Sequence, residues 1–359
     1  MTAPELSFTL ALHRLLATDP ARGFAWSPYS VASALGVVAA GARGRTRDEL
    51  AEVVGDLDAL AAGLSAGAAL KDDAVTIGVA NTLWADLTLP VAPEYLAAVK
   101  SWPGGTARGA DFRGDAEGVR QEINADVSRS TRDLIKDLLP AGLLDRETRA
   151  VIVNALYLRA SWTKPFEKGQ TRPQPFRTPG GEVSVPTMRT TRSLPYAARS
   201  GWTLVSVPAG GGVLADVLLP DGDLAPLDAA TLTDLLAAAT PREVALELPR
   251  VTVRGQASLA EPLAGLGIQR LFGDQADLTG VTGGKEGLKV DAALHKAVLT
   301  LDEAGLEGAA ATALMMTRLA AITAPPRPVA VRVDRPFLLQ IRHRPTNALY
   351  FLAQVTDPR

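Results

Sequence analysis

The chain lacks cysteine and contains very little histidine. None of its 359 residues is cysteine, and three are histidine: His13, His295 and His343. The absence of cysteine excludes disulfide scaffolds, thiolate zinc centres and cysteine nucleophiles. Three scattered histidines leave little material for histidine-based metal sites or catalytic triads. The composition therefore predicts neither a metal nor a cofactor.

Neither an excess of one charge nor a long hydrophobic run is present. The 37 basic and 39 acidic side chains give a net charge of −2, whereas nucleic-acid or anionic-membrane partners favour a basic excess. No apolar run approaches the roughly 18 residues of a membrane span. Glu5, His13 and Arg14 interrupt the pattern of a secretory signal. The sequence predicts a cytoplasmic protein with no nucleic-acid or membrane partner.

Helical patterns come first along the chain and strand patterns follow. Helices are expected over residues 30–42, 58–70 and about 115–131, and strands over 74–84 and 151–162, with short strands dominating after about residue 183. No linker or repeat divides the chain, so we expect one domain over residues 1–359. This order predicts an α+β fold.

Three local patterns give more specific expectations. Thr46 and Glu49 have the spacing of a capping box at the start of a helix. Residues 244–253 fit a single strand, and residues 288–302 fit either a strand or an amphipathic helix.

Two motifs resemble catalytic ones but lack the required context. Gly63-Leu64-Ser65-Ala66-Gly67 matches a nucleophile elbow, yet helical residues precede it where a strand is required. Gly283-Gly284-Lys285-Glu286 has glutamate where a phosphate loop needs Ser or Thr. A hydrolase built on Ser65 is a minor alternative, and the sequence favours a protein that is not an enzyme.

Residues 303–324 are compatible with two structures. Their alanine content favours a helix. Counted as a strand, however, one face is small or apolar except for a single hydroxyl: Leu306, Gly308, Ala310, Thr312, Leu314 and Met316. A segment compatible with both conformations suggests a conformational switch.

Several longer stretches resemble the serpin family, in the family's order and along nearly the whole chain. They are FAWSPYSVASAL at 24–35, GARGRT at 41–46, NALYLRASW at 154–162, DRPF at 334–337 and FLAQVTDP at 351–358. The resemblance implies a serpin fold, with three β-sheets, eight or nine helices and an exposed reactive-centre loop at about residues 303–328. It also implies a monomeric inhibitor of serine proteases, of the bacterial, inhibitory type.

The implied mechanism is suicide inhibition. A serine protease cleaves the loop and forms an acyl-enzyme, the freed loop inserts into the central sheet, and the trapped protease cannot deacylate. The alternative is a non-inhibitory serpin that acts as a binding or chaperone-like protein.

By the same resemblance, a hinge of small residues precedes the reactive site: Glu303, Gly305, Leu306, Glu307, Gly308, Ala309, Ala310, Ala311 and Thr312. The usual family spacing places the scissile bond between Leu319 and Ala320, which suits chymotrypsin-like or subtilisin-like proteases. A loop one residue shorter would place it between Arg318 and Leu319 and select trypsin-like enzymes.

The resemblance assigns two further groups of residues. Ser27, Ser30, Asn154 and His295, here called the shutter cluster, match the group that controls opening of the central sheet. Trp162, Arg250 and Glu303, the breach cluster, match the group at the loop's insertion point. Three residues depart from the family pattern: Leu306 replaces a usual Thr or Ser, Asp126 replaces a common Trp, and Ala353 replaces a common Gly.

Overall fold

The computed structural model describes residues 3–70, 72–284, 288–306 and 327–359. Within these ranges there are nine α-helices and three short 3₁₀ helices. The α-helices are α1 (Ala3–Leu16), α2 (Pro28–Gly41), α3 (Gly44–Val54), α4 (Leu57–Ala68), α5 (Pro93–Val99), α6 (Phe112–Ser130), α7 (Ala229–Ala238), α8 (Ala260–Gly265) and α9 (Thr279–Thr282). The 3₁₀ helices are η1 (Lys168–Gln170), η2 (Gly210–Gly212) and η3 (Arg270–Phe272).

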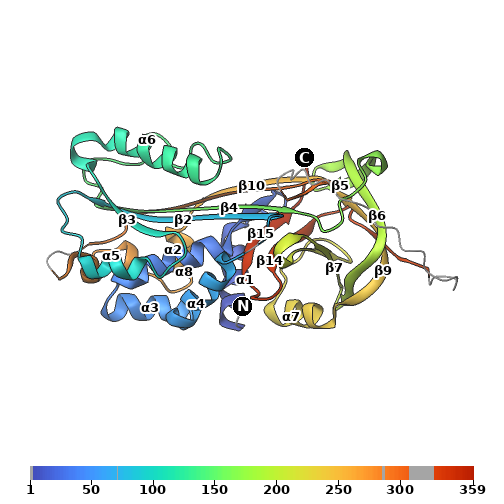
Figure 1. The fold of residues 1–359 in the computed structure, drawn as a ribbon, viewed down its shortest axis with the longest axis horizontal. Helices are drawn as coiled ribbons and strands as arrows, with labels where there is room; N and C mark the ends of the chain where they lie inside the picture. The colour runs from blue at the N-terminus through green and yellow to red at the C-terminus, as the bar shows by residue number, and fades with distance from the viewer. Residues whose placement is uncertain (1–2, 71, 285–287, 307–326) are drawn as a thin grey trace.

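A six-stranded sheet forms the centre of the molecule, with strand order β10-β11-β12-β4-β2-β3. Its strands are β2 (Val75–Asp86), β3 (Gly105–Ala110), β4 (Ala150–Ser161), β10 (Val251–Ser258), β11 (Ala292–Leu301) and β12 (Gly305–Leu306). Helix α6 covers one face of this sheet, and α1 to α5 lie on the other (Figure 1). Because β4 is covered on both faces, it is apolar and buried along nearly its whole length.

The remaining strands form a nine-stranded sheet, ordered β1-β15-β14-β8-β7-β6-β9-β13 with β5 paired to β6. They are β1 (Phe24–Trp26), β5 (Arg172–Thr178), β6 (Gly181–Arg199), β7 (Trp202–Pro208), β8 (Val213–Pro220), β9 (Thr240–Pro249), β13 (Val329–Arg332), β14 (Phe337–His343) and β15 (Leu349–Val355). The expected α+β fold is confirmed. Two of its three expected sheets are joined here, because the 19-residue β6 pairs with β9 and β7 in succession.

Two local expectations are wrong. The capping box fails because α3 begins at Gly44, which places Thr46 inside the helix, where its hydroxyl accepts the Asp277 amide. Glu49 accepts the backbone amides of Gln269 and Arg270 instead of capping the helix. Residues 244–253 form parts of two strands, β9 and β10, which separate at Arg250. The ambiguous segment 288–302 contains strand β11.

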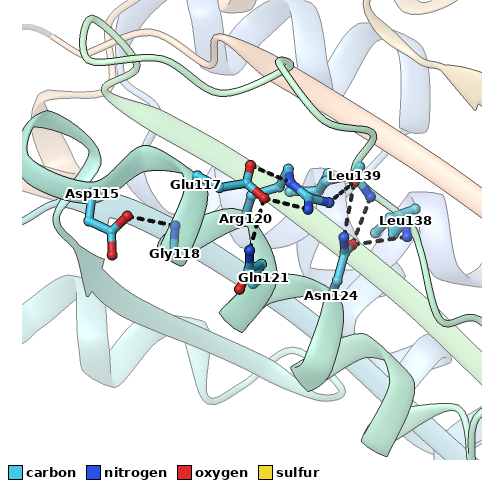
Figure 2. Close-up of polar contacts among 8 residues, drawn as sticks. All are labelled: Asp115, Glu117, Gly118, Arg120, Gln121, Asn124, Leu138 and Leu139. Carbon is cyan, nitrogen blue, oxygen red and sulfur yellow. Dashed lines mark hydrogen bonds and ion pairs between the residues drawn. The ribbon is translucent and has the colours of Figure 1, made fainter.

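The chain that follows α6 is fastened to the helix by polar contacts (Figure 2). The side-chain oxygen of Asn124 accepts hydrogen bonds from the backbone amides of Leu138 and Leu139 at 3.0 and 2.8 Å. The side-chain nitrogen of Asn124 donates to the backbone carbonyl of Leu139 at 3.0 Å. Arg120 donates to the same carbonyl and also pairs with Glu117. Asn124 is thus the buried link that positions α6 above the central sheet.

We predict that Asn124→Ala lowers the free energy of unfolding by about 3 kcal/mol, because it leaves two buried amides without acceptors. Urea denaturation measures this change. Gln121→Ala is the matched control, since its amide reaches only the exposed Glu117, and we expect a change below about 0.5 kcal/mol. Equal effects of the two substitutions would contradict the role assigned to Asn124.

Candidate functional site

The central sheet is closed at one end and contains an added strand at the other. Strands β4 and β11 are parallel and pair directly over residues 151–154 and 292–295. At the opposite end the two-residue strand β12 lies between them, antiparallel to both. Among the described residues, the strand between β4 and β11 consists of Gly305 and Leu306.

Leu306 already occupies an interior position of this sheet. It pairs with Ala160 on one side and Leu301 on the other, and its side chain is 1% exposed. Gly305 precedes it with a φ of 155°, and a Cβ there would lie 2.2 Å from the Ala160 carbonyl oxygen. Only glycine fits that approach. The replacement of Thr or Ser by Leu thus gives this position an apolar anchor in the core.

The structure brings the breach cluster together beside β12. The Glu303 carboxylate, 2% exposed, is held by the Arg250 guanidinium through three contacts of 2.8 to 3.1 Å. The Thr171 hydroxyl donates to the same carboxylate at 2.6 Å. Burial alone would raise the pKa of Glu303, but the hydrogen bonds from Arg250 and Thr171 outweigh it and lower the pKa. The carboxylate is therefore ionised and paired.

Trp162 holds the chain on both sides of Glu303. Its indole donates to the Asp302 carbonyl at 2.8 Å, and its amide donates to the Ala304 carbonyl at 3.0 Å. The Phe166 amide donates to the Glu303 carbonyl, and the Phe166 ring packs edge-on against Trp162. These contacts fix the point at which the chain leaves β11 and turns back into the sheet.

The shutter cluster lies where β4 and β11 pair directly. The Ser27 amide donates to His295 Nε2 at 3.0 Å, and His295 Nδ1 lies 3.0 Å from the Asn154 carbonyl oxygen. The side-chain nitrogen of Asn154 donates to the backbone carbonyl of Ser30 at 2.7 Å. All four residues are buried. Because Nε2 accepts a hydrogen bond, Nδ1 must carry the proton and donate it to Asn154.

Ser27 and Ser30 enter the cluster through different atoms. The Ser27 hydroxyl caps α2 by accepting the Ser30 amide at 3.1 Å. Ser30 contributes its carbonyl, and its own hydroxyl has no partner among the described residues. The backbone of the first turn of α2, more than its hydroxyl groups, therefore holds the two strands of the sheet.

Two contributing residues, Asn81 and Thr171, are not predicted by the sequence analysis. Asn81 of β2 faces Asn154 in register and accepts its amide, and its own amide donates to the Ser33 hydroxyl and the Pro103 carbonyl. Asn81 could have been noticed in the sequence, because it is a polar residue within an apolar strand. Thr171 gave no such signal, because its contact with Glu303 joins residues 132 positions apart.

The remaining candidate residues fall outside the breach and shutter clusters. Glu307 to Thr312, the remaining hinge residues, lie outside the described residues, as do Arg318, Leu319 and Ala320. Ser65 lies inside helix α4, with its hydroxyl directed to the Ser101 carbonyl, so it forms no nucleophile elbow. Asp126 of α6 pairs with Arg108 of β3 and with Arg129 of its own helix. In the described part of the chain no group of side chains is placed to hold a metal ion, and no helix has the length and apolar character needed to cross a bilayer.

The chain is similar to known proteins along nearly its whole length. A family model described as serpin (serine protease inhibitor) matches residues 4–358. A serine protease inhibitor from Cyanea capillata is 31% identical, with 92% of this chain and 91% of that protein covered. Leukocyte elastase inhibitor from Sus scrofa is 31% identical, with 100% and 99% covered. The solved structure of native protease nexin-1 with heparin has a TM-score of 0.87 and 27% identity, with 99% of each chain covered.

The six-stranded and nine-stranded sheets, with the helices packed on them, form the fold of the solved structure that the chain matches over 99% of its length. The chain belongs to the serpin family. The resemblance stated from the sequence motifs is confirmed.

Acid is expected to destabilise the folded protein through its buried histidines. Burial lowers the pKa of His295 to about 4, and burial together with the neighbouring Arg14 lowers the pKa of His13 to about 4. Between their ordinary pKa of 6.5 and 4, the unfolded chain binds protons that the folded chain does not, so stability falls as pH falls. Each histidine contributes a loss on the order of 3 kcal/mol by pH 4.

Urea denaturation at pH 7.5, 6.0 and 5.0 measures this loss, and the midpoint is expected to fall at each step. His295→Gln should reduce the slope between pH 6.0 and 5.0, because one of the two titrating side chains is removed. A midpoint that stays constant from pH 7.5 to 5.0 would show that these histidines are already protonated, or accessible to protons, in the folded state.

Proposed function

We propose that this protein inhibits serine proteases by a suicide-substrate mechanism. The protease cleaves the loop at about residues 303–328, forms an acyl-enzyme, and is trapped when the freed loop inserts between β4 and β11. The observation that carries the proposal is β12: Gly305 and Leu306 already pair with both strands. All catalytic groups belong to the protease in this scheme, and the inhibitor acts as a monomer with no cofactor.

The register of β12 indicates where each later residue would pair during insertion. Leu306 lies opposite Ala160 of β4 and Leu301 of β11. Continuing both antiparallel registers by six residues places Thr312 opposite Asn154 and also opposite His295. The two counts agree, so a single strand can satisfy both neighbours at once. Thr312 carries the one hydroxyl on the inward face of the segment, and it would arrive between the two polar residues that insertion separates.

The position of Thr312 opposite both Asn154 and His295 supports insertion of the loop into the sheet over a loop that only blocks the protease sterically. Separating Asn154 from His295 leaves a buried donor and a buried acceptor without partners, which is unfavourable. A hydroxyl can donate and accept at once, so Thr312 would restore both bonds. An apolar residue at that position would restore neither.

The target class follows from the residue before the scissile bond. With Leu319 there, we propose chymotrypsin-like or subtilisin-like proteases, because their pockets accept a large apolar side chain. Arg318 at that position would select trypsin-like enzymes instead. The alternative function is that of a binding or chaperone-like serpin. In such a protein the loop is cleaved without trapping the protease.

Incubation with chymotrypsin, subtilisin and trypsin tests the proposal. We expect a complex with chymotrypsin or subtilisin that survives denaturing electrophoresis, and a released C-terminal peptide that begins at Ala320. A peptide that begins at Leu319, with trypsin as the trapped enzyme, would move the scissile bond by one residue. Cleavage by the whole panel with no stable complex would refute inhibition and favour the binding or chaperone-like function.

A matched pair of substitutions tests insertion itself. Ala310→Glu places a charge on the face that continues from the buried Leu306, so burying it is costly and cleavage should outpace trapping. Ala311→Glu places the same charge on the opposite face. We expect the number of inhibitor molecules cleaved per protease trapped to rise at least tenfold for Ala310→Glu and less than threefold for Ala311→Glu. Equal values for both variants would contradict the register argument.

A further inference from the structure

A cavity of about 260 Å³ is lined by residues of α1, α2 and α4. These helices lie on the side of the central sheet away from α6 (Figure 1). Helices α1, α2 and α4 form most of its wall, and the end of α3 and the start of β15 complete it. The rings of Phe8 and Tyr29 line it together with Leu60 and Leu64. The cavity is separate from the breach and shutter clusters, and the proposed inhibition does not use it.

Gly63 keeps this cavity open at a cost to its own helix. Glycine within a helix is less favourable than alanine. Gly67, one turn later in α4, is required by packing, because a Cβ there would lie 2.8 Å from Ala348 Cβ and 3.1 Å from the Tyr29 ring. A Cβ on Gly63 would meet no heavy atom within 4 Å, and Gly63 lines the cavity. Gly63 is itself exposed, so it lies at the mouth of the cavity, where a larger side chain would project into the opening.

The polar groups of the wall define the charge that the cavity accepts. Glu5 is the one charged side chain among the described residues that line it, and it is negative. The Tyr29 hydroxyl is already committed to the Leu64 carbonyl at 2.6 Å. The Thr346 hydroxyl interacts with His343 Nδ1 at 2.8 Å. Because no lysine, arginine or histidine lines the described wall, the cavity offers no cation to hold an anion.

We propose that this cavity binds a small aromatic molecule of one or two rings that carries no negative charge. An engineered apolar cavity of about 150 Å³ binds benzene, and ligand pockets commonly begin near 300 Å³. A volume of 260 Å³ therefore suits one or two rings. Phe8 and Tyr29 supply aromatic surfaces for edge or offset contacts.

The position of the cavity gives an occupant direct contact with the start of α2. Pro28, Tyr29 and Ala32 line it, and they belong to the same first turns of α2 that present Ser27 and Ser30 to the shutter cluster. The binding claim is independent of the proposed inhibition, and its test needs no protease.

Indole is the probe, and benzoate is its negatively charged counterpart of similar size. Isothermal titration of the full chain should give a dissociation constant for indole below about 1 mM, with benzoate at least tenfold weaker. Saturating indole should raise the melting temperature, because a ligand that binds only the folded chain stabilises it.

Gly63→Leu fills the cavity and should weaken indole binding at least tenfold. Gly222→Leu is the matched control, since a Cβ on Gly222 also meets no heavy atom within 4 Å and Gly222 lies outside the cavity wall. If Gly63→Leu fails to fold, Ala59→Leu narrows the same cavity from one turn earlier in α4. Gly63→Ala should raise the melting temperature of the free protein by about 2 °C while weakening indole binding.

The outcomes are decisive in either direction. Tight indole binding that is lost in Gly63→Leu or Ala59→Leu and kept in Gly222→Leu supports the site. Absence of indole binding at millimolar concentration, equal binding by Gly63→Leu and Gly222→Leu, or benzoate binding as tight as that of indole would each overturn it.

Discussion

The hydrogen bond between His295 and Asn154 is the interaction on which the rest of the structure depends. It joins β11 to β4 at the end where the two strands pair directly, so it holds the central sheet closed. Around it, the start of α2 fixes His295 from below through the Ser27 amide, and Asn81 supports Asn154 from the neighbouring strand. A buried polar bond of this kind is stable only while every partner is satisfied. Separating the two strands at this point would leave a buried donor and a buried acceptor without partners.

Much of the fold could be predicted from the sequence because its local signals agree with the tertiary structure. The apolar run of β4 predicts a strand covered on both faces, and the small apolar residues of α2 predict a buried helix. The capping box failed because Thr46 and Glu49 contact the 269–277 segment instead of their own helix. The break at Arg250 was missed because β9 and β10 belong to different sheets, and no local pattern encodes which sheet a strand joins.

Some residues of the candidate site could likewise be predicted from the sequence, and others could not. The family resemblance assigned Asn154, His295, Trp162 and Glu303, and the structure brings Asn154 to His295 and Trp162 to the chain on both sides of Glu303. Thr171 could not be found, because a threonine in a polar connection has no pattern until the fold brings it to Glu303. The sequence analysis placed Leu306 on one face of a possible strand, whereas the structure buries it between β4 and β11. That difference depends on the register of two residues between two strands, which no local pattern encodes.

The two ends of the segment after Leu306 belong to different sheets, and this has a consequence for length. The segment leaves β12 in the central sheet and rejoins the chain at β13, which pairs with β9 in the other sheet. A break after Leu319 would leave residues 307–319 tethered to the central sheet alone. Extended at about 3.3 Å per residue, they reach about 43 Å, and β4 itself has 12 residues. The tether and the sheet are therefore matched in length, so a protease attached at its end would be carried from one edge of the molecule to the other.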